Sequence, residues 1–170
     1  MTVASRTRLE PSDVGRILGW HESETAGPTL IVVAGLHANE PAGLEAGARI
    51  HAAIDEGEGL RCGRRVTLRG NLTALRSPAD SPWLRPRYID HDLNRQFAFD
   101  LSGDRAATVE AGEAAVLSDT IESLVETADG PVYLLDLHTV SSDSPAFVAL
   151  EDSLAARDFA MRFPLPKLLG

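Results

Sequence analysis

Two short runs of apolar residues stand out in the pattern along this chain. Thr29–Ala34 has the sequence TLIVVA, is rich in β-branched residues, and lies between Gly27-Pro28 and Gly35. Val132–Leu137 has the sequence VYLLDL and follows Gly130-Pro131. Continuous apolar runs of this length are typical of strands that are buried on both faces of a sheet. We therefore predict two central strands at these positions.

Helical spacing of apolar residues appears between and after these runs. Pro41 opens a pattern in which Leu44, Ala48 and Ala52 recur, and Gly57 is a plausible stop. The segment 108–128 is the clearest predicted helix, and a further helix is expected at 153–163. The apolar stripe expected on the 108–128 helix consists of Val109, Ala115 or Val116, Ile121, Leu124 and Val125.

Shorter strands complete the predicted set of elements. We expect them at 16–20, 66–68, 72–75 and 147–150, whereas the three prolines between residues 76 and 87 predict a loop there. Strands that alternate with helices along a chain are typical of a layered α/β fold.

Composition and charge narrow the function classes. The chain has 170 residues and a formal net charge of −9, which argues against a nucleic-acid binder because such proteins normally present a basic face. Cys62 is the only cysteine, so an intrachain disulfide is impossible. The first thirteen residues contain no apolar segment typical of a secretory signal, and no apolar run approaches the roughly 20 residues of a membrane helix. We predict a soluble cytoplasmic protein that binds neither nucleic acid nor membrane.

His37 and Glu40 follow the first predicted central strand, where the helix begins. In open α/β sheets, ligands bind at the carboxyl ends of the strands. A spacing of three residues allows one turn of backbone to direct both side chains at a common point, and imidazole and carboxylate are both good zinc ligands. The alternative is that both residues merely cap the helix.

Asp136 and His138 close the second central strand. They are two residues apart, so they lie on the same side of that strand, and a polar pair there interrupts an apolar run. Buried charges are costly unless they are paired or bind a metal. The alternative is a core histidine held by its neighbouring aspartate. Taken together, two histidines and one glutamate at two strand ends favour a catalytic zinc set with its fourth position open to water.

A third cluster of polar residues spans 87–97, with the sequence RYIDHDLNRQF. Two arginines and an asparagine suit the recognition of carboxylates, because the guanidinium group is a planar fork that matches a carboxylate. By composition alone, a solvated charged loop is the alternative. His91 lies within this cluster and is a weaker candidate for a further metal ligand. We expect His21 and His51 to be ordinary side chains, and Glu45 and Glu113 to be solvated.

The motifs GLHANEPAG, RYIDHDLNRQF and LLDLHT, in this order, resemble the succinylglutamate desuccinylase/aspartoacylase family of the zinc carboxypeptidase clan. VALEDS at 148–153 also resembles a family segment, so the resemblance spans about 30 to 153. It implies a three-layer α/β/α sandwich around a mixed sheet, as in zinc carboxypeptidases. Residues 1–170 would then be the N-terminal, zinc-binding part of the hydrolase domain, with its C-terminal side incomplete.

The resemblance also implies roles for individual residues. One Zn²⁺ per chain would be held by His37, Glu40 and His138. Arg87 would stabilise the oxyanion of the scissile carbonyl. Asn94 and Arg95 would bind the acidic groups of the substrate, a small anionic N-acyl amino acid. Asp92 resembles the carboxylate that holds the first ligand histidine. Apart from the resemblance, we expect Asp136 to orient a neighbouring residue, and the alternative is that it acts as the base. Asn71 matches a family asparagine whose role we leave open.

The implied reaction is hydrolysis of the amide bond of an N-acyl amino acid. The glutamate that acts as general base in the family lies in a Gly-x-Glu strand, and Glu151, the only glutamate after His138, does not match it. We therefore expect the general base to lie outside this chain, and the open sheet edge to favour association into a homo-oligomer. Two alternatives remain open at this point: a carboxypeptidase that acts on a peptide C-terminus, and a non-catalytic zinc- or ligand-binding fragment.

Overall fold

The computed structural model describes residues 15–97, 107–140 and 142–170. The chain divides into two compact units, Met1–Thr139 and Val140–Gly170.

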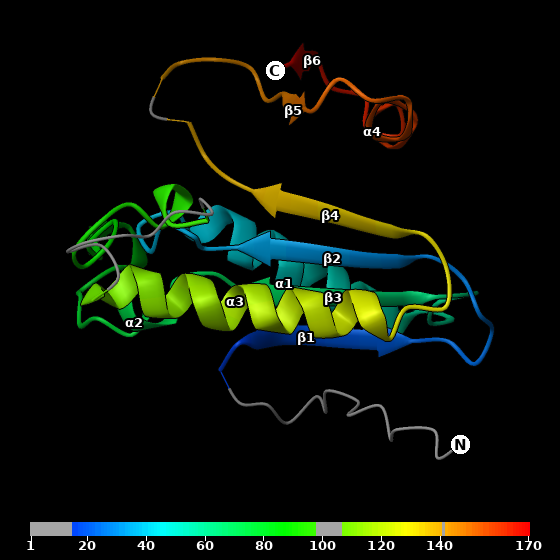
Figure 1. Ribbon diagram of the computed structural model, residues 1–170, viewed down its shortest axis with the longest axis horizontal. Coiled ribbons are helices and arrows are strands. Elements are labelled where there is room, and N and C mark those ends of the chain that lie inside the picture. The colour runs from blue at the N-terminus through cyan, green and yellow to red at the C-terminus, as the bar shows by residue number, and fades with distance from the viewer. Residues whose placement is uncertain (1–14, 98–106, 141) are drawn as a thin grey trace. The chain divides into compact units, whose positions relative to one another are not determined.

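The first unit is built on a four-stranded mixed sheet. Its strands, in the order β1-β3-β2-β4, are Ile17–Glu22, Arg64–Arg69, Thr29–Ala34 and Val132–Leu137. β2 pairs in parallel with both β3 and β4, whereas β1 is antiparallel to β3. The two predicted central strands are therefore neighbours, and their arrowheads lie side by side at one end of the sheet (Figure 1). The predicted strands at 16–20 and 66–68 correspond to β1 and β3.

Helices cover both faces of this sheet. The chain moves from β2 through α1 (Pro41–Glu56) to β3, and then returns through α3 (Val109–Glu126) to β4. Because parallel crossovers share one hand, two crossovers that run in opposite directions place their helices on opposite faces. Figure 1 shows α3 in front of the sheet and α1 behind it. The predicted three-layer α/β/α sandwich with a mixed sheet is confirmed.

The main apolar core lies between the sheet and α3. Ile31, Val66 and Leu68 from the strands cluster with Leu117 and Leu124 from the helix, and all five are buried. On the other face α1 approaches very closely. A Cβ atom on Gly47 would lie 3.0 Å from the Thr67 side chain, so the absence of a side chain at residue 47 allows this contact.

The apolar stripe predicted for α3 is partly wrong. Leu124 is buried as expected, but Val116 is 53% exposed and Val125 is 47% exposed. The face that meets the sheet carries Ala114 and Leu117, one turn apart. Periodicity allowed both stripes, and the direction from which the helix meets the sheet selected the second.

The strand predicted at 72–75 is wrong, because these residues form the short helix α2 (Leu72–Leu75). Asn71 is its N-cap, and its side-chain oxygen accepts a hydrogen bond from the Ala74 amide at 3.0 Å. A side-chain cap of this kind favours the helix over the extended conformation. The predicted loop that follows contains the 3₁₀ turn η1 (Pro82–Leu84), and a second 3₁₀ turn, η2, spans Leu93–Arg95.

The second unit is small. It contains β5 (Val148–Leu150), α4 (Leu154–Ala160) and β6 (Lys167–Leu169), and β5 pairs in parallel with β6. The predictions at 147–150 and 153–163 correspond to β5 and α4, whereas β6 was not predicted. Ser153 caps α4 by accepting a hydrogen bond from the Ala156 amide.

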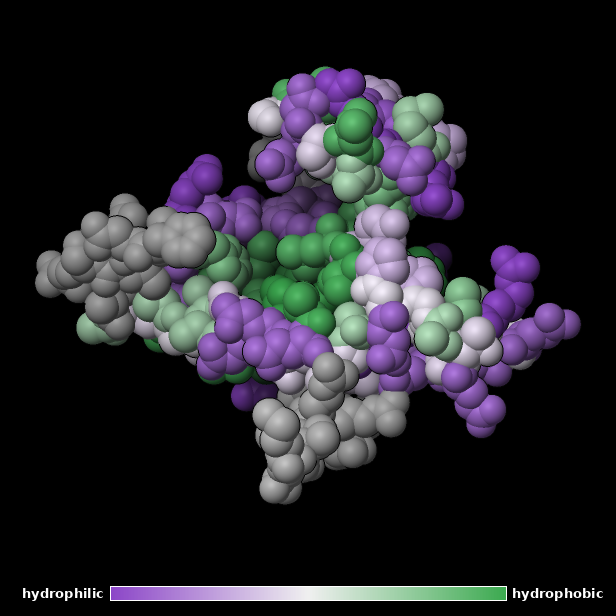
Figure 2. All heavy atoms as spheres, turned by 45° about the vertical axis from the view of Figure 1, so that its right-hand side comes forward, coloured by the Kyte–Doolittle hydropathy of each residue, from purple (hydrophilic) through white to green (hydrophobic). Residues whose placement is uncertain are grey.

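The prediction that 132–137 is a central strand buried on both faces is wrong. Among the described residues β4 is an edge strand with no buried residue, and its Leu134 is 55% exposed. The space-filling view in Figure 2 shows a group of hydrophobic side chains (green) on one face, with hydrophilic side chains (purple) beside it. The expected association into a homo-oligomer stays a prediction.

None of the helices in the described part of the chain is long and apolar enough to cross a membrane.

Candidate metal centre

The candidate site lies at the carboxyl ends of β2 and β4. The parallel register pairs Ala34 with Leu137, so the residues that follow these two strands start from adjacent positions. Gly35 has a φ of +73°, a conformation that side chains rarely adopt, and a Cβ there would press against Leu44 and Leu75. This glycine turns the chain sharply out of β2 and into the segment that carries His37.

The three predicted metal ligands meet at this edge. His37, Glu40 and His138 each place one ligand atom within 4.8 Å of the others. The two imidazole rings have centroids 4.9 Å apart and are inclined by 74°. His37 and Glu40 are buried, whereas His138 is an exposed residue whose side chain is 26% accessible to solvent. Two histidines and one glutamate in this arrangement are a donor set that suits zinc.

Both ring nitrogens of His37 contact a carboxylate oxygen. Its Nε2 lies 2.9 Å from Oδ1 of Asp92, and its Nδ1 lies 3.0 Å from Oε1 of Glu40. With Nε2–H donating to Asp92, the lone pair on Nδ1 points at a carboxylate oxygen, so a proton or a metal must lie between them. Two ligands of one tetrahedral zinc ion are separated by about 3.3 Å, which matches this pair of atoms.

The Glu40 carboxylate is held at both oxygens. Oε2 accepts a hydrogen bond from the Thr139 amide at 2.7 Å, and Oε1 accepts one from the Arg87 guanidinium at 2.6 Å. Burial alone would raise the pKa of Glu40, but these two donors and the nearby His37 hold it below its usual value. The group is therefore an ionised carboxylate at neutral pH, as a metal ligand must be.

His138 is bonded through both ring nitrogens. Nδ1 lies 2.6 Å from Oδ2 of Asp136, and Nε2 lies 3.0 Å from the side-chain nitrogen of Asn94. The hydrogen bond to Asp136 raises the pKa of His138, against the opposing effect of burial. Asp136 therefore contacts the ring that it was expected to orient, and this orienting role stays a prediction. Metal binding would replace one of these two contacts of His138.

The 87–97 segment supplies the remaining predicted site residues. Asp92 caps η2 by accepting a hydrogen bond from the Asn94 amide at 2.9 Å, while its carboxylate holds His37. The side chain of Arg87 is 39% exposed, so it contacts Glu40 while remaining accessible. Arg95 follows Asn94 in η2 and is exposed. The structure therefore brings Arg87 and Asn94 into contact with the ligand cluster. Arg95 is the next residue after Asn94.

Two buried carboxylates near this segment were not recognised in the sequence. Glu113 was predicted to be solvated, but its side chain is only 10% exposed and pairs with Arg16. Glu110 is completely buried, and one of its hydrogen bonds comes from Asn71, whose role had been left open. Glu110 lies one turn before Ala114 on the buried stripe of α3, so its place in the helical pattern was the available signal.

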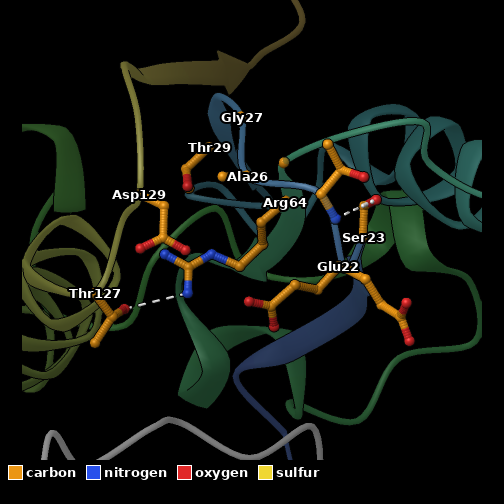
Figure 3. A pocket seen from close by; sticks show the side chains of 11 residues that line it. Glu22, Ser23, Ala26, Gly27, Thr29, Arg64, Thr127 and Asp129 are labelled. Atoms are coloured by element: carbon orange, nitrogen blue, oxygen red, sulfur yellow. Dashed lines mark hydrogen bonds between the residues drawn. The ribbon is translucent and has the colours of Figure 1, made fainter.

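A separate polar hollow lies at the opposite end of the sheet (Figure 3). It is lined by residues at the start of β2 and β3 and at the end of α3, including Thr29, Arg64 and Thr127. Arg64 donates to the Leu124 carbonyl at 2.6 Å and to Thr127, so its guanidinium closes the end of α3. The geometry assigns this residue a structural role, well away from the metal ligands.

Comparison with known proteins gives one family. A sequence model of the succinylglutamate desuccinylase/aspartoacylase catalytic domain matches residues 26–164. A comparison with curated proteins found no match.

Three solved structures are similar to this chain. The succinylglutamate desuccinylase from Chromobacterium violaceum has a TM-score of 0.66 at 21% identity, over 85% of this chain and 46% of that one. The enzyme of the same name from Vibrio parahaemolyticus has a TM-score of 0.57 at 20% identity, with 76% and 42% covered. A putative succinylglutamate desuccinylase/aspartoacylase family protein from Shewanella amazonensis has a TM-score of 0.55 at 18% identity, with 89% and 48% covered. These likenesses establish the fold, and the chain spans less than half the length of each neighbour.

Proposed function

Because this chain belongs to the succinylglutamate desuccinylase/aspartoacylase family, we propose that it carries the zinc-binding part of an enzyme that hydrolyses the amide bond of an N-acyl amino acid. The observation that carries the proposal is the convergence of His37, Glu40 and His138 at the carboxyl ends of two neighbouring parallel strands. Zinc bound there would act as a Lewis acid toward the amide carbonyl and lower the pKa of water to about 7.

Each surrounding side chain has a definite task in this proposal. Asp92 holds the Nε2–H of His37, so that the ring keeps the orientation and tautomer that a ligand needs. Arg87, already within 2.6 Å of Glu40, donates hydrogen bonds to the carbonyl oxygen as negative charge develops on it. Such preorganised donors stabilise the transition state more than the substrate, because the charge appears only there.

Asn94 and Arg95 are proposed to bind the carboxylate groups of the substrate. Asn94 lies at the edge of the ligand cluster, where its amide contacts His138, and Arg95 is exposed to solvent beside it. A guanidinium group would bind a carboxylate through two parallel hydrogen bonds. This provides a reason for an anionic substrate to approach a chain whose net charge is −9. The proton acceptor for the attacking water is assigned to none of the described residues.

Metal analysis of the purified chain tests the proposal. We expect one zinc per chain, and loss of that zinc in His37→Ala. The matched control is His91→Ala, because His91 is exposed in the adjacent loop and does not belong to the ligand cluster. Stoichiometric zinc in the His37 variant, or equal loss in both variants, would contradict the ligand set.

Substrate class is tested on the zinc-loaded chain by calorimetry. N-succinyl and N-acetyl amino acids should bind, and Arg95→Gln should weaken binding without changing zinc content. Preferential binding of a peptide with a free C-terminus would instead support the carboxypeptidase alternative.

A further inference from the structure

The carboxylate of Glu110 is the most completely enclosed charged group near the metal centre. Its residue is fully buried, and its two oxygens accept four hydrogen bonds. Oε1 accepts from the Asn71 side chain at 2.9 Å and from the Ile89 amide at 2.7 Å. Oε2 accepts from the amides of Asp90 at 3.0 Å and His91 at 3.1 Å. Three consecutive backbone amides therefore converge on one side chain.

These hydrogen bonds keep the group ionised. Burial alone would raise the pKa of Glu110, but the hydrogen bonds from Ile89, Asn71 and the next two amides hold it below its usual value. A buried charge is tolerated only where its hydrogen-bonding capacity is filled, and here each oxygen has two donors. Three of the four donors to this anion are backbone amides of the 89–91 loop, and the fourth is the buried side chain of Asn71.

The anchored amides lie between two residues of the metal centre. Arg87, which contacts Glu40, comes two positions before Ile89, and Asp92, which contacts His37, comes directly after His91. The attachment also runs in the other direction, because the Asp90 carboxylate accepts a hydrogen bond from the Val109 amide at the start of α3. The loop and α3 are consequently joined in both directions: loop amides donate to Glu110, and the Val109 amide of α3 donates to Asp90.

Asn71 connects the same carboxylate to the loop that holds the first two ligands. It is fully buried, and its backbone amide donates to the Gly35 carbonyl at 2.9 Å. The Ala38 amide in turn donates to the Arg87 carbonyl at 3.2 Å. A continuous set of hydrogen bonds therefore runs from the segment after β2, through Asn71 and Glu110, to the loop that carries Arg87 and Asp92.

From this arrangement we propose that Glu110 is a positioning residue of the metal centre, which sets Asp92 against His37 and Arg87 against Glu40 by anchoring the backbone between them. The inference rests on the proposed function, since the centre it serves is the proposed zinc site. If Glu110 only stabilised the start of α3, its replacement would lower the stability of the fold but would leave the metal affinity of the folded chain unchanged.

The test compares Glu110→Gln with Glu113→Gln. Glutamine has a single acceptor oxygen, so its amide nitrogen must face two N–H donors: either the amides of Asp90 and His91, or the Ile89 amide and the Asn71 side chain. Glu113 lies one turn further along α3, and its side chain is 10% exposed. It pairs with Arg16 and accepts hydrogen bonds from Thr73 instead of from the 89–91 loop. It thus provides the same chemical change on the same helix without contact to the anchored segment.

Zinc affinity of the full chain is measured by competition with a chromophoric chelator, and the geometry of the centre by the visible spectrum of the cobalt-substituted chain. We expect Glu110→Gln to weaken zinc binding by about tenfold, the lower end of the loss typical when a hydrogen bond that orients a metal ligand is removed. The cobalt spectrum should change in this variant and stay unchanged in Glu113→Gln. Equal weakening in both variants, or none in either, overturns the proposal.

Amide hydrogen exchange of the metal-free chain separates this proposal from the proposed function. The amides of Ile89, Asp90 and His91 should exchange at least about tenfold faster in Glu110→Gln than in the wild type or in Glu113→Gln. The reason is that these amides donate to the Glu110 carboxylate and would lose acceptor capacity in that variant. If the wild type binds no zinc, the proposed function fails, and selective loss of protection would still support the anchoring role. Unchanged exchange in Glu110→Gln overturns that role whatever the zinc content.

Discussion

A buried histidine pair on the α1 face of the sheet should make the stability of this protein depend on pH. His51 of α1 contacts the Thr67 hydroxyl through Nε2 at 2.8 Å and Nδ1 of His21 through Nδ1 at 2.7 Å. His21 in turn contacts Asp55 through Nε2 at 2.7 Å. With both rings neutral, one assignment satisfies every contact: Thr67 donates to His51, His51 donates to His21, and His21 donates to Asp55.

A proton added to His51 has no place in this chain of hydrogen bonds. Burial, followed by the nearby Arg65 and His21, lowers the pKa of His51 from 6.5 to about 4, against the opposing charge of Asp55. The unfolded chain therefore binds a proton at this residue as pH falls through about 6.5, whereas the folded chain does so only near pH 4. Stability is full above that window and falls as pH decreases through it.

The size of the effect follows from the two pKa values. A shift of one unit corresponds to about 1.4 kcal/mol, so lowering the pH from about 7.5 to about 5 should reduce the free energy of unfolding by about 2 kcal/mol through this residue. Urea denaturation at the two pH values measures the loss. His51→Gln should lose about 2 kcal/mol less than the wild type over this interval, and the exposed His91→Gln should behave as the wild type.

An equal loss of stability in the wild type and in His51→Gln would refute this reasoning. A direct measurement avoids dependence on the variant: the His51 ring can be titrated by nuclear magnetic resonance in the wild-type chain. A titration midpoint near the ordinary value for histidine would contradict the assigned tautomers and the burial of this ring.

Three further predictions follow from the site and its surroundings. Asp92→Asn should reduce zinc affinity roughly 10- to 100-fold, measured by chelator competition, because the Nε2–H of His37 loses its charged partner; unchanged affinity would contradict the orienting role. Arg87→Ala should lower turnover of the complete enzyme more than its zinc content, and equal loss of both would contradict the oxyanion role. Gly19→Ala should destabilise the fold by about 1–3 kcal/mol in urea denaturation, because its Cβ would lie 2.3 Å from the His51 ring; wild-type stability would show that this ring can move aside.

Local patterns in the sequence were sufficient to predict the strands β2 and β4 and to select His37, Glu40 and His138, which the structure brings together. TLIVVA forms β2, in which five of six residues are buried, as expected of a strand covered on both faces. VYLLDL forms the edge strand β4, in which no residue is buried, so its apolar run predicted a strand but not its place in the sheet. His37, Glu40 and His138 interrupt these apolar patterns at the strand ends, where parallel pairing brings distant residues together. A short polar motif that directly follows a predicted strand can thus be placed at the end of that strand from the sequence alone.

The roles of Asn71, Glu110 and Glu113 could be decided only by the tertiary structure. As single letters, a glutamate in a helix and an asparagine after a glycine are compatible with solvent, and Glu113 was accordingly predicted to be solvated. Each of these side chains is buried because its partner arrives from far away in the sequence, as Arg16 does for Glu113 and Asn71 for Glu110. Helical periodicity specifies which residues share a face, but the burial of a charge depends on donors that only the packed fold brings within hydrogen-bonding distance.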